Sequence, residues 1–384
     1  MPDTLTRPAL PGSALLAAIA AEAPARDRDA GFPFAALARL HEAGLLALTV
    51  PRALGGAGAG LAQAAETIQA LGAACPATAL VVAMQLSKHA ALARGQGFTP
   101  ALRESLGRLA VTEGALLNSA RAEPELGSPT RGGLPATTAR RGPKGWLITG
   151  RKRYVTGAPG LRFMEVVAAT AEDEPRIGSF LVPANAPGVQ IVEAWNHLGL
   201  RASGSHDVVF RDVPVPYEHV AGLAPAAAWG ARDDVQAAWN AVIVSAVYLG
   251  VAEAARDWVL AFLNSRQPSG LPQPLSALAT VQQAVGEIEL KRITARRLIR
   301  SLAQDADAGL APVAAESGAV KAELAKLAIA IVDRAASLAG NHALDRANPL
   351  ERHWRDVQCA RVHVPTEDAA AQAAGRFALA GAAA

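Results

Sequence analysis

The sequence predicts an α+β protein that is mostly α-helical, in three consecutive blocks: an N-terminal helical domain over residues 1–118, a central β domain over 119–223 and a C-terminal helical bundle over 224–384. Apolar residues recur at helical spacing in both outer blocks. Residues 120–220 are instead rich in Gly, Pro, Thr and Val, and their apolar runs are short and separated by turn residues. Because 51% of the 384 residues are hydrophobic, the chain can form a sizeable core.

In the first block, the helical spacing is clearest over residues 35–48, 61–71 and 77–94. Pro51 and the pair Gly55-Gly56 interrupt it with a turn. In the second block, short alternating runs predict the strands of a small antiparallel barrel or sandwich. These strands are Trp146–Thr149, Glu165–Ala169, Ser179–Val182, Val189–Glu193 and Asp207–Phe210.

Long helices return in the third block. Three are predicted over Asp233–Asn264, Thr280–Ala308 and Ala314–Ala339, and Gly340 follows the last as a C-terminal cap. A fourth begins near Pro349, a residue favoured in a first helical turn. Thr366 is placed to cap a last helix, Glu367–Leu379.

Charge and cysteine content exclude several classes of protein. The net charge is only +3, and the basic residues are not interleaved with aromatic ones, so no nucleic-acid partner is expected. Cys75 and Cys359 lack metal-ligand spacing, which predicts two reduced thiols and no metal site. The apolar run at residues 14–20 is too short to span a bilayer. We therefore expect a soluble, cytoplasmic protein without a membrane partner.

Six short motifs narrow the fold. In their order along the chain they resemble motifs of the acyl-CoA dehydrogenase superfamily, and together they cover roughly residues 30–370. The resemblance implies an N-terminal helical domain, a central β domain, a C-terminal four-helix bundle and a homodimer or homotetramer. The motifs are Leu45–Gly60, Ala122–Ser128, Gly150–Thr156, Leu198–Val215, Arg266 and Pro349–Asp356.

The resemblance also implies a flavin site. It places Ser128 and Thr156 near the flavin ring and phosphates, and Tyr154 where the family has a Trp beside the ring. Thr156, two residues after Tyr154, would face the same side of one strand. Arg266 would reach the pyrophosphate of a neighbouring subunit's flavin, and Gly340 and Thr366 complete the cofactor-binding set.

The flavin type stays open in the sequence. FAD is favoured over FMN, but Ser269-Gly270 and Ala279 replace residues that the family uses near the adenine half. A flavin that is supplied in reduced form and then leaves is therefore also compatible with these motifs.

The catalytic base of the dehydrogenases is missing. In the family, a Glu removes the proton next to the thioester carbonyl, from one of two positions. Without gaps, those positions are Val364 and Asn240 here, and neither is a carboxylate. Glu367 or Asp368 would serve only if the loop were shifted, and both are also explained as favourable charge in a first helical turn.

His363 and Pro365 resemble a His-x-Pro stretch in flavin-dependent monooxygenases of the same fold, such as dibenzothiophene monooxygenases, which also carry a pair like Thr156-Gly157. Such enzymes need a group that protonates or holds activated oxygen, and histidine suits this role because its pKa is near neutrality. His363 is the first candidate, with His89 and His206 as further ones, oriented by Ser203 or Ser205. For each, a buried structural histidine is the alternative.

Three functions remain open. The first is a two-component monooxygenase that uses O2 and reduced flavin from a flavin reductase on a small apolar substrate. The second is an acyl-CoA dehydrogenase with a displaced base and an electron-transfer flavoprotein as partner. The third is a degenerate flavin-binding homologue.

Overall fold

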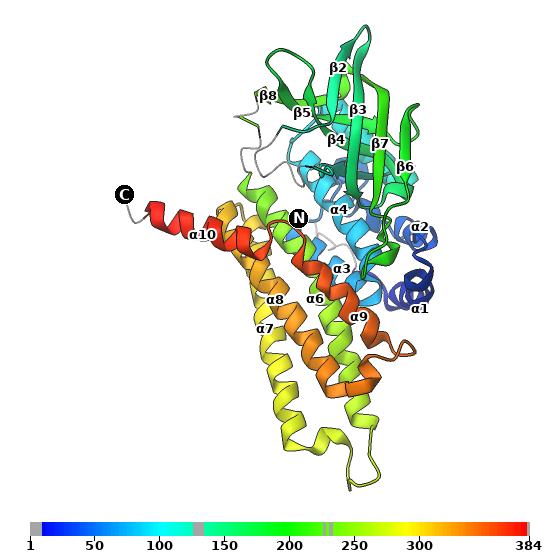
Figure 1. Cartoon of the computed structure of the whole chain (residues 1–384), viewed down its shortest axis with the longest axis vertical. Coiled ribbons are helices and arrows are strands. Elements are labelled where there is room, and N and C mark those ends of the chain that lie inside the picture. Colours follow the sequence, from blue (N-terminus) through cyan, green and yellow to red (C-terminus); the bar gives the residue numbers. More distant parts are fainter. Residues whose placement is uncertain (1–9, 126–133, 226–227, 230–232, 382–384) are drawn as a thin grey trace, which may run out of the picture.

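The computed structural model describes residues 10–125, 134–225, 228–229 and 233–381. N-terminal helices, a sheet and a C-terminal helical bundle follow one another along the chain (Figure 1). The fold class predicted from the sequence is confirmed: an N-terminal helical part, a central sheet and a C-terminal helical part.

Five α-helices and two short 3-10 helices precede the sheet in the described residues. Among the helices, α4 occupies the central position: it packs against α3 and α6 and also against strand β1. Most of its side chains are buried, including the polar Gln85 and His89. The α-helices are α1 (Ser13–Asp29), α2 (Phe34–Glu42), α3 (Leu61–Ala74), α4 (Pro76–Ala93) and α5 (Pro100–Glu113).

The sheet has eight strands in the described residues, and it is mixed rather than antiparallel as the sequence suggested. Strands β1 and β2 both pair in parallel with β4, whereas the other pairings are antiparallel. The order is β6-β7-β3-β2-β4-β5-β8, with β1 attached to β4. The strands are β1 (Leu116–Ala120), β2 (Thr138–Gly142), β3 (Gly145–Val155), β4 (Leu161–Thr170), β5 (Arg176–Pro183), β6 (Val189–Val192), β7 (His206–Pro216) and β8 (Val220–Pro225).

Three of these strands were not predicted. The clearest case is β2, whose residues Arg140 and Arg141 are exposed and whose sequence has no alternating apolar pattern. It is a strand because its backbone pairs with β3 across the short turn that follows it. Pairing of this kind leaves no periodic signal in the strand's own sequence.

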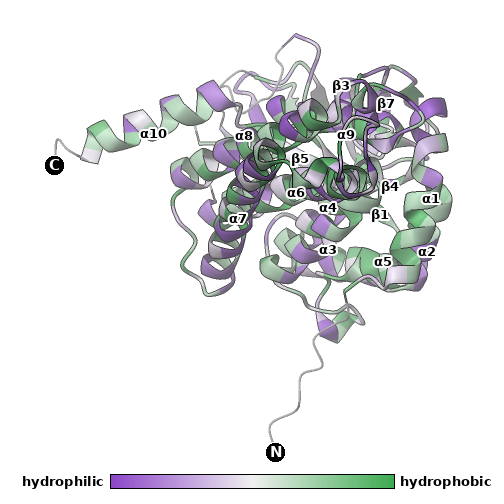
Figure 2. Cartoon of the chain, turned by 90° about the horizontal axis from the view of Figure 1, so that it is seen from below, coloured by the Kyte–Doolittle hydropathy of each residue, from purple (hydrophilic) through white to green (hydrophobic). Residues whose placement is uncertain are grey.

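The C-terminal helices lie close to the predicted bounds, because their apolar periodicity is long and regular. Helices α6, α7, α8 and α9 pack together. Helix α10 projects away from the rest of the molecule (Figures 1 and 2). The helices are α6 (Asp234–Ser265), α7 (Ala279–Asp307), α8 (Ala314–Ala339), α9 (Pro349–Gln358) and α10 (Glu367–Gly381).

Helix α6 is the core of the bundle. Its length and apolar composition would suffice to cross a membrane, but 78% of its most apolar window is buried inside the fold. Helices α3, α4, α7, α8 and α9 cover it. This burial identifies α6 as a core helix of the fold.

Candidate active site

The loop between α9 and α10 carries His363, the first catalytic candidate. The imidazole is half-buried, and its ring centre lies 5.6 Å from that of Tyr248 on α6. Lys321 of α8 donates hydrogen bonds to the backbone carbonyls of His363 and, at 2.9 Å, of Pro365. Burial, and then the positive charge of Lys321, lowers the pKa of His363 to about 4. The imidazole is therefore neutral near pH 7.

The two positions predicted for the family's base are Val364, in the same loop as His363, and Asn240, on α6. Val364 is half exposed in the same loop. Asn240 belongs to a polar network: its Oδ1 accepts a hydrogen bond of 2.9 Å from the side-chain amide of Gln236, which also donates to Ser87 at 3.0 Å. The side-chain carbonyl of Gln236 in turn accepts a hydrogen bond of 2.8 Å from the guanidinium of Arg94. Among the described residues, no carboxylate hydrogen bonds the side chain of Asn240.

His89, the second candidate, lies on α4 with only 2% of its surface exposed. Its Nε2 atom has no hydrogen-bond partner among the described residues. Burial, and then the charge of Lys88, lowers the pKa of His89 to about 4. A neutral imidazole with a free ring nitrogen can exchange a hydrogen bond with a bound molecule.

The helix that carries His89 and the ring of His363 both contact α6. Ser87, two residues before His89, hydrogen bonds Asn240 at 3.4 Å, and the ring of His363 meets Tyr248. Asn240 and Tyr248 are eight residues apart on α6, which corresponds to about 12 Å along its axis. Helix α4 and the loop of His363 therefore contact one stretch of α6, but Ser87 and His89 are two residues apart and face different sides of α4.

Tyr154 and Thr156 do not face the same side of one strand, and that expectation is wrong. Strand β3 ends at Val155, its pairing with β7 shifts between Lys152 and Val155, and Tyr154 has a φ of 57°. This break in the strand removes the regular alternation of side chains. The two side chains consequently have separate environments.

The hydroxyl of Thr156 belongs to a short chain of hydroxyl groups. It lies 3.0 Å from the hydroxyl of Ser205, which lies 2.8 Å from that of Ser203. The side-chain amide of Asn118 on β1 donates to the carbonyl of Thr156 at 3.0 Å. Ser203 and Ser205 are buried, so the chain leads inward from the end of β3.

The ring of Tyr154 is half exposed and belongs to an aromatic cluster. Trp195 and His197 stack with their ring centres 3.7 Å apart, and Tyr154 meets both edge-on at 6.2 and 5.7 Å. The guanidinium of Arg153 lies 4.8 Å from the ring centre of Tyr154. Trp195 and His197 were not recognised in the sequence, since only the fold brings their loop beside β3.

His206, the third catalytic candidate, begins β7 and pairs with Val155 of β3. Its Nδ1 accepts a hydrogen bond of 3.2 Å from the backbone of Trp195. This contact gives His206 a structural partner. Ser128, the other residue expected at the flavin, lies outside the described residues.

Arg266 and Gly340 lie at the opposite end of the bundle. Arg266 is exposed immediately after α6, and Gly340 ends α8. Phe262 and His342, their near neighbours in sequence, have ring centres 5.0 Å apart. The ends of α6 and α8 are remote from the sheet (Figure 1). Thr366 is instead half-buried in the loop of His363.

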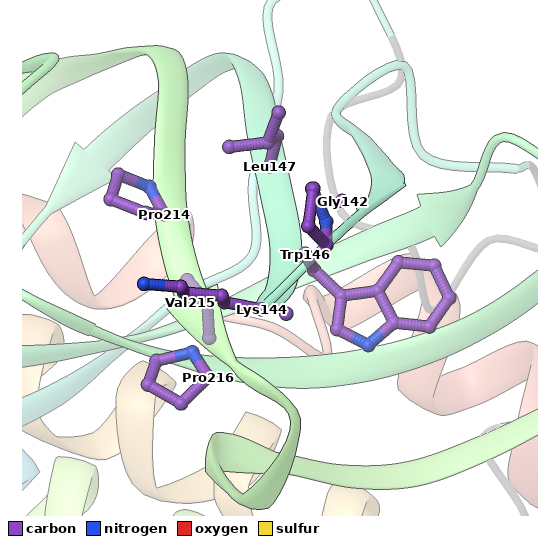
Figure 3. A pocket seen from close by; sticks show the side chains of 9 residues that line it. Gly142, Lys144, Trp146, Leu147, Pro214, Val215 and Pro216 are labelled. Carbon is purple, nitrogen blue, oxygen red and sulfur yellow. The ribbon is translucent and has the colours of Figure 1, made fainter.

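A surface cavity of about 500 Å³ opens elsewhere, at the turn between β2 and β3 (Figure 3). Its lining contains none of the predicted site residues and one charged side chain, Lys144. The cavity is therefore not part of the candidate active site.

Tyr248 and Lys321 are the residues at the site that the sequence did not reveal. The hydroxyl of Tyr248 is buried without a hydrogen-bond partner among the described residues, and burial raises its pKa well above the ordinary value. One feature of the sequence could have identified Lys321 as a site residue. It falls on the buried face of α8 with Ser317, Leu324 and Ala328. A lysine at such a position needs a specific partner.

The three family models for acyl-CoA dehydrogenases match the chain in order. The N-terminal model matches residues 14–96, the middle model 119–213 and the C-terminal model 242–368. The chain therefore belongs to the acyl-CoA dehydrogenase family, whose members are flavin-dependent oxidoreductases. The family predicted from the sequence motifs is confirmed, and so is a flavin as cofactor.

The relatives of this chain include proteins named as acyl-CoA dehydrogenases and proteins named as nitrososynthases. The putative acyl-CoA dehydrogenase YdbM of Bacillus subtilis is 33% identical over 89% of this chain and 89% of its own length. The L-evernosamine nitrososynthase of a Micromonospora species is 31% identical over 88% of this chain and 82% of its own. A solved structure of KijD3 with FMN and dTDP-3-amino-2,3,6-trideoxy-4-keto-3-methyl-D-glucose is 31% identical, with a TM-score of 0.85 over 98% of this chain and 96% of that one.

Proposed function

We propose that this chain is a flavin-dependent monooxygenase that receives reduced flavin from a separate reductase and oxidises a small substrate with O2. The observation that carries the proposal is the replacement of the base: Val364 and Asn240 occupy the two positions where a dehydrogenase has its Glu. A Val side chain cannot accept a proton, and the uncharged amide of Asn240 is hydrogen-bonded to Gln236 and Ser87. Proton removal next to a thioester therefore lacks its catalyst.

The side chains near the end of β3 fit a flavin. The hydroxyls of Thr156 and Ser205 can donate to ring oxygen or nitrogen atoms, and the half-exposed ring of Tyr154 offers an apolar surface. In the proposed reaction, the bound flavin supplies the electrons that activate O2. The remaining chemistry falls to the residues of this chain.

His363 and His89 are the groups proposed to donate a proton or a hydrogen bond to the activated oxygen. Burial keeps both imidazoles neutral near pH 7, so each can donate an N–H hydrogen bond without bringing a charge into an apolar site. Tyr248 covers His363 on the side of α6. His206 is the weakest of the three candidates, because Trp195 already occupies its Nδ1.

A second copy of the chain would complete the cofactor site. Arg266 and Gly340 follow the ends of α6 and α8 that are remote from the sheet, whereas Thr156 directly follows β3 of that sheet, so we infer that the two groups do not hold one flavin within one chain. A neighbouring subunit whose bundle lies alongside would bring its Arg266 to the pyrophosphate of FAD. FMN ends before that point, so its binding would not depend on Arg266.

The relatives suggest a substrate class. A nitrososynthase, by its name, oxidises an amino nitrogen, and KijD3 was solved with an amino-sugar nucleotide. Near α4 and α6, Ser87, Gln236 and Asn240 present uncharged hydrogen-bonding groups that could orient an amine or a hydroxyl. Small amines and amino-sugar nucleotides are therefore tested beside the small apolar compounds that the sequence suggested.

The likeness to YdbM favours one second candidate, an acyl-CoA dehydrogenase whose base is Glu367 or Asp368. Both side chains are exposed at the start of α10, and Glu367 pairs with Lys326 at 2.8 Å. Each carboxylate lies about one helical turn from residue 364, so it could act as the base only if the loop shifted by that amount. An electron-transfer flavoprotein would then be the redox partner.

Two mixing experiments separate these functions. In the first, flavin-loaded protein is mixed without oxygen with short, medium and branched acyl-CoAs, and flavin absorbance is followed. We expect no rapid bleaching, and bleaching by any of them would exclude the proposal. In the second, reduced flavin and O2 are supplied together with the substrate panel, and oxygen in product is compared with hydrogen peroxide released. The matched variant His363→Gln should release peroxide without product while still binding flavin.

A further inference from the structure

Lys321 is a buried lysine without a carboxylate partner among the described residues. Only 3% of its surface is exposed, and no ion pair involves it in the described part of the chain. Its ammonium group donates to two backbone carbonyls, those of His363 and Pro365. Burying an ammonium group is unfavourable unless its hydrogen bonds are satisfied, so these two carbonyls must be held in place.

The same face of α8 makes a second contact with this loop. Gly318 lies one helical turn before Lys321, and a Cβ atom added to it would stand 3.1 Å from Cγ of Pro365. The absence of a side chain at residue 318 lets Pro365 sit close to the helix. Gly318 and Lys321 thus form one contact surface on α8 for residues 363–365.

We propose that Lys321 is a positioning residue for His363: it fixes the carbonyls on both sides of Val364 to α8 and thereby presents the imidazole to Tyr248 and the active site. The proposal rests on the proposed function for the catalytic role of His363. It adds a specific requirement, which is that the geometry of His363 depends on a helix residue 42 positions earlier.

The other charged groups around His363 do not replace Lys321. On α10, Glu367 is exposed and paired with Lys326, and Asp368 is exposed. On α6, the facing group is the neutral phenol of Tyr248. Lys321 is therefore the charge that acts on the imidazole, and it lowers the pKa of His363 in addition to the larger effect of burial.

The test compares Lys321→Met with Lys326→Met in the full-length protein. Both variants remove one positive charge from α8, but Lys326 is exposed and pairs with Glu323 and Glu367. The chain has only 8 histidines, so the ring signal of His363 can be resolved by NMR in ¹³C-histidine-labelled protein and assigned with His363→Gln. This titration needs neither flavin nor turnover.

In Lys321→Met we expect the pKa of His363 to rise by about one unit, because the charge is gone while part of the burial remains. Amide exchange of residues 362–366 should accelerate by about tenfold or more. Lys326→Met should change neither. If Lys321→Met does not fold, Lys321→Gln is used, which lacks the charge but keeps a donor. It should raise the pKa to a similar extent and accelerate exchange less.

Unchanged titration and unchanged exchange in a folded Lys321 variant would overturn the inference. In flavin-loaded protein, Lys321→Met should lower the ratio of product to peroxide while the flavin affinity stays within about twofold. If the wild-type protein forms no oxygenated product at all, the proposed function fails, yet the titration and exchange results still decide the inference.

Discussion

The backbone N–H of Leu200 donates a hydrogen bond of 2.7 Å to the carboxylate of Asp356. Leu200 precedes the 3-10 turn before β7, whereas Asp356 lies on α9 in the bundle. Arg355, the residue before Asp356 on α9, forms an ion pair of 2.6 Å with Asp27 of α1. Two consecutive residues of α9 therefore join the N-terminal helices, the β domain and the bundle.

Asp356→Ala should lower the free energy of unfolding by about 1–3 kcal/mol, because the buried N–H of Leu200 loses its acceptor. Asp356→Asn retains an acceptor and should cost less. Urea unfolding at pH 7 measures both differences. Equal stability of the Ala variant and the wild type would show that this hydrogen bond does not join the parts of the fold.

The same carboxylate should produce a pH dependence. Burial raises the pKa of Asp356 to about 6, above its ordinary value of 3.8. A raised pKa contributes stability that is present at low pH and is lost as the pH rises through about 6. The stability of the wild type relative to Asp356→Asn should therefore fall between pH 4 and 6, as unfolding curves over this range would show. A difference that does not change with pH would contradict the prediction.

His353 should have the opposite effect. It is buried on α9, and burial, followed by the charge of Arg352, lowers its pKa to about 3. Below pH 6.5 the unfolded chain binds a proton that the folded protein does not, so stability present above pH 6.5 is lost on acidification. The slope is up to about 1.4 kcal/mol per pH unit. His353→Gln should flatten the profile between pH 6.5 and 4, and the exposed His342→Gln serves as the control.

Arg266→Ala should weaken FAD binding by about tenfold and leave FMN binding unchanged, because only FAD has a pyrophosphate for this side chain to hold. Calorimetric titration of the flavin-free protein with each flavin gives both affinities. Arg300→Ala, another exposed arginine of the bundle, is the control. An equal loss for both flavins would mean that Arg266 acts through folding or assembly instead.

The protein should be a homo-oligomer that uses the outer face of α7. Leu290 and Ile293 are exposed there, at 69% and 50%, on neighbouring turns of the helix. Leu290→Asp combined with Ile293→Asp should shift the sedimentation of the protein towards the monomer, because exposed apolar faces of this kind favour association. Leu310→Asp, in the loop after α7, should not. A wild-type monomer at micromolar concentration would exclude the prediction.

The sequence by itself determined the order of the three parts and the bounds of the long helices. Helical periodicity is repeated over many residues in α6, α7 and α8, so these helices can be recognised from the sequence without knowledge of the fold. The prediction that the catalytic base is missing also came from the sequence, since Val364 and Asn240 were found from short motifs and counting. The family membership depends on the same local motifs.

Only the tertiary structure decided which side chains meet. The register shift between β3 and β7 gives Tyr154 and Thr156 separate environments, and no pattern in the sequence of the strand predicts this shift. Lys321 reaches a loop that lies 42–44 residues further along the chain. Contacts between distant segments carry no periodic signal in the sequence, and burial, which keeps His89 and His363 neutral, results from the packing of several helices at once.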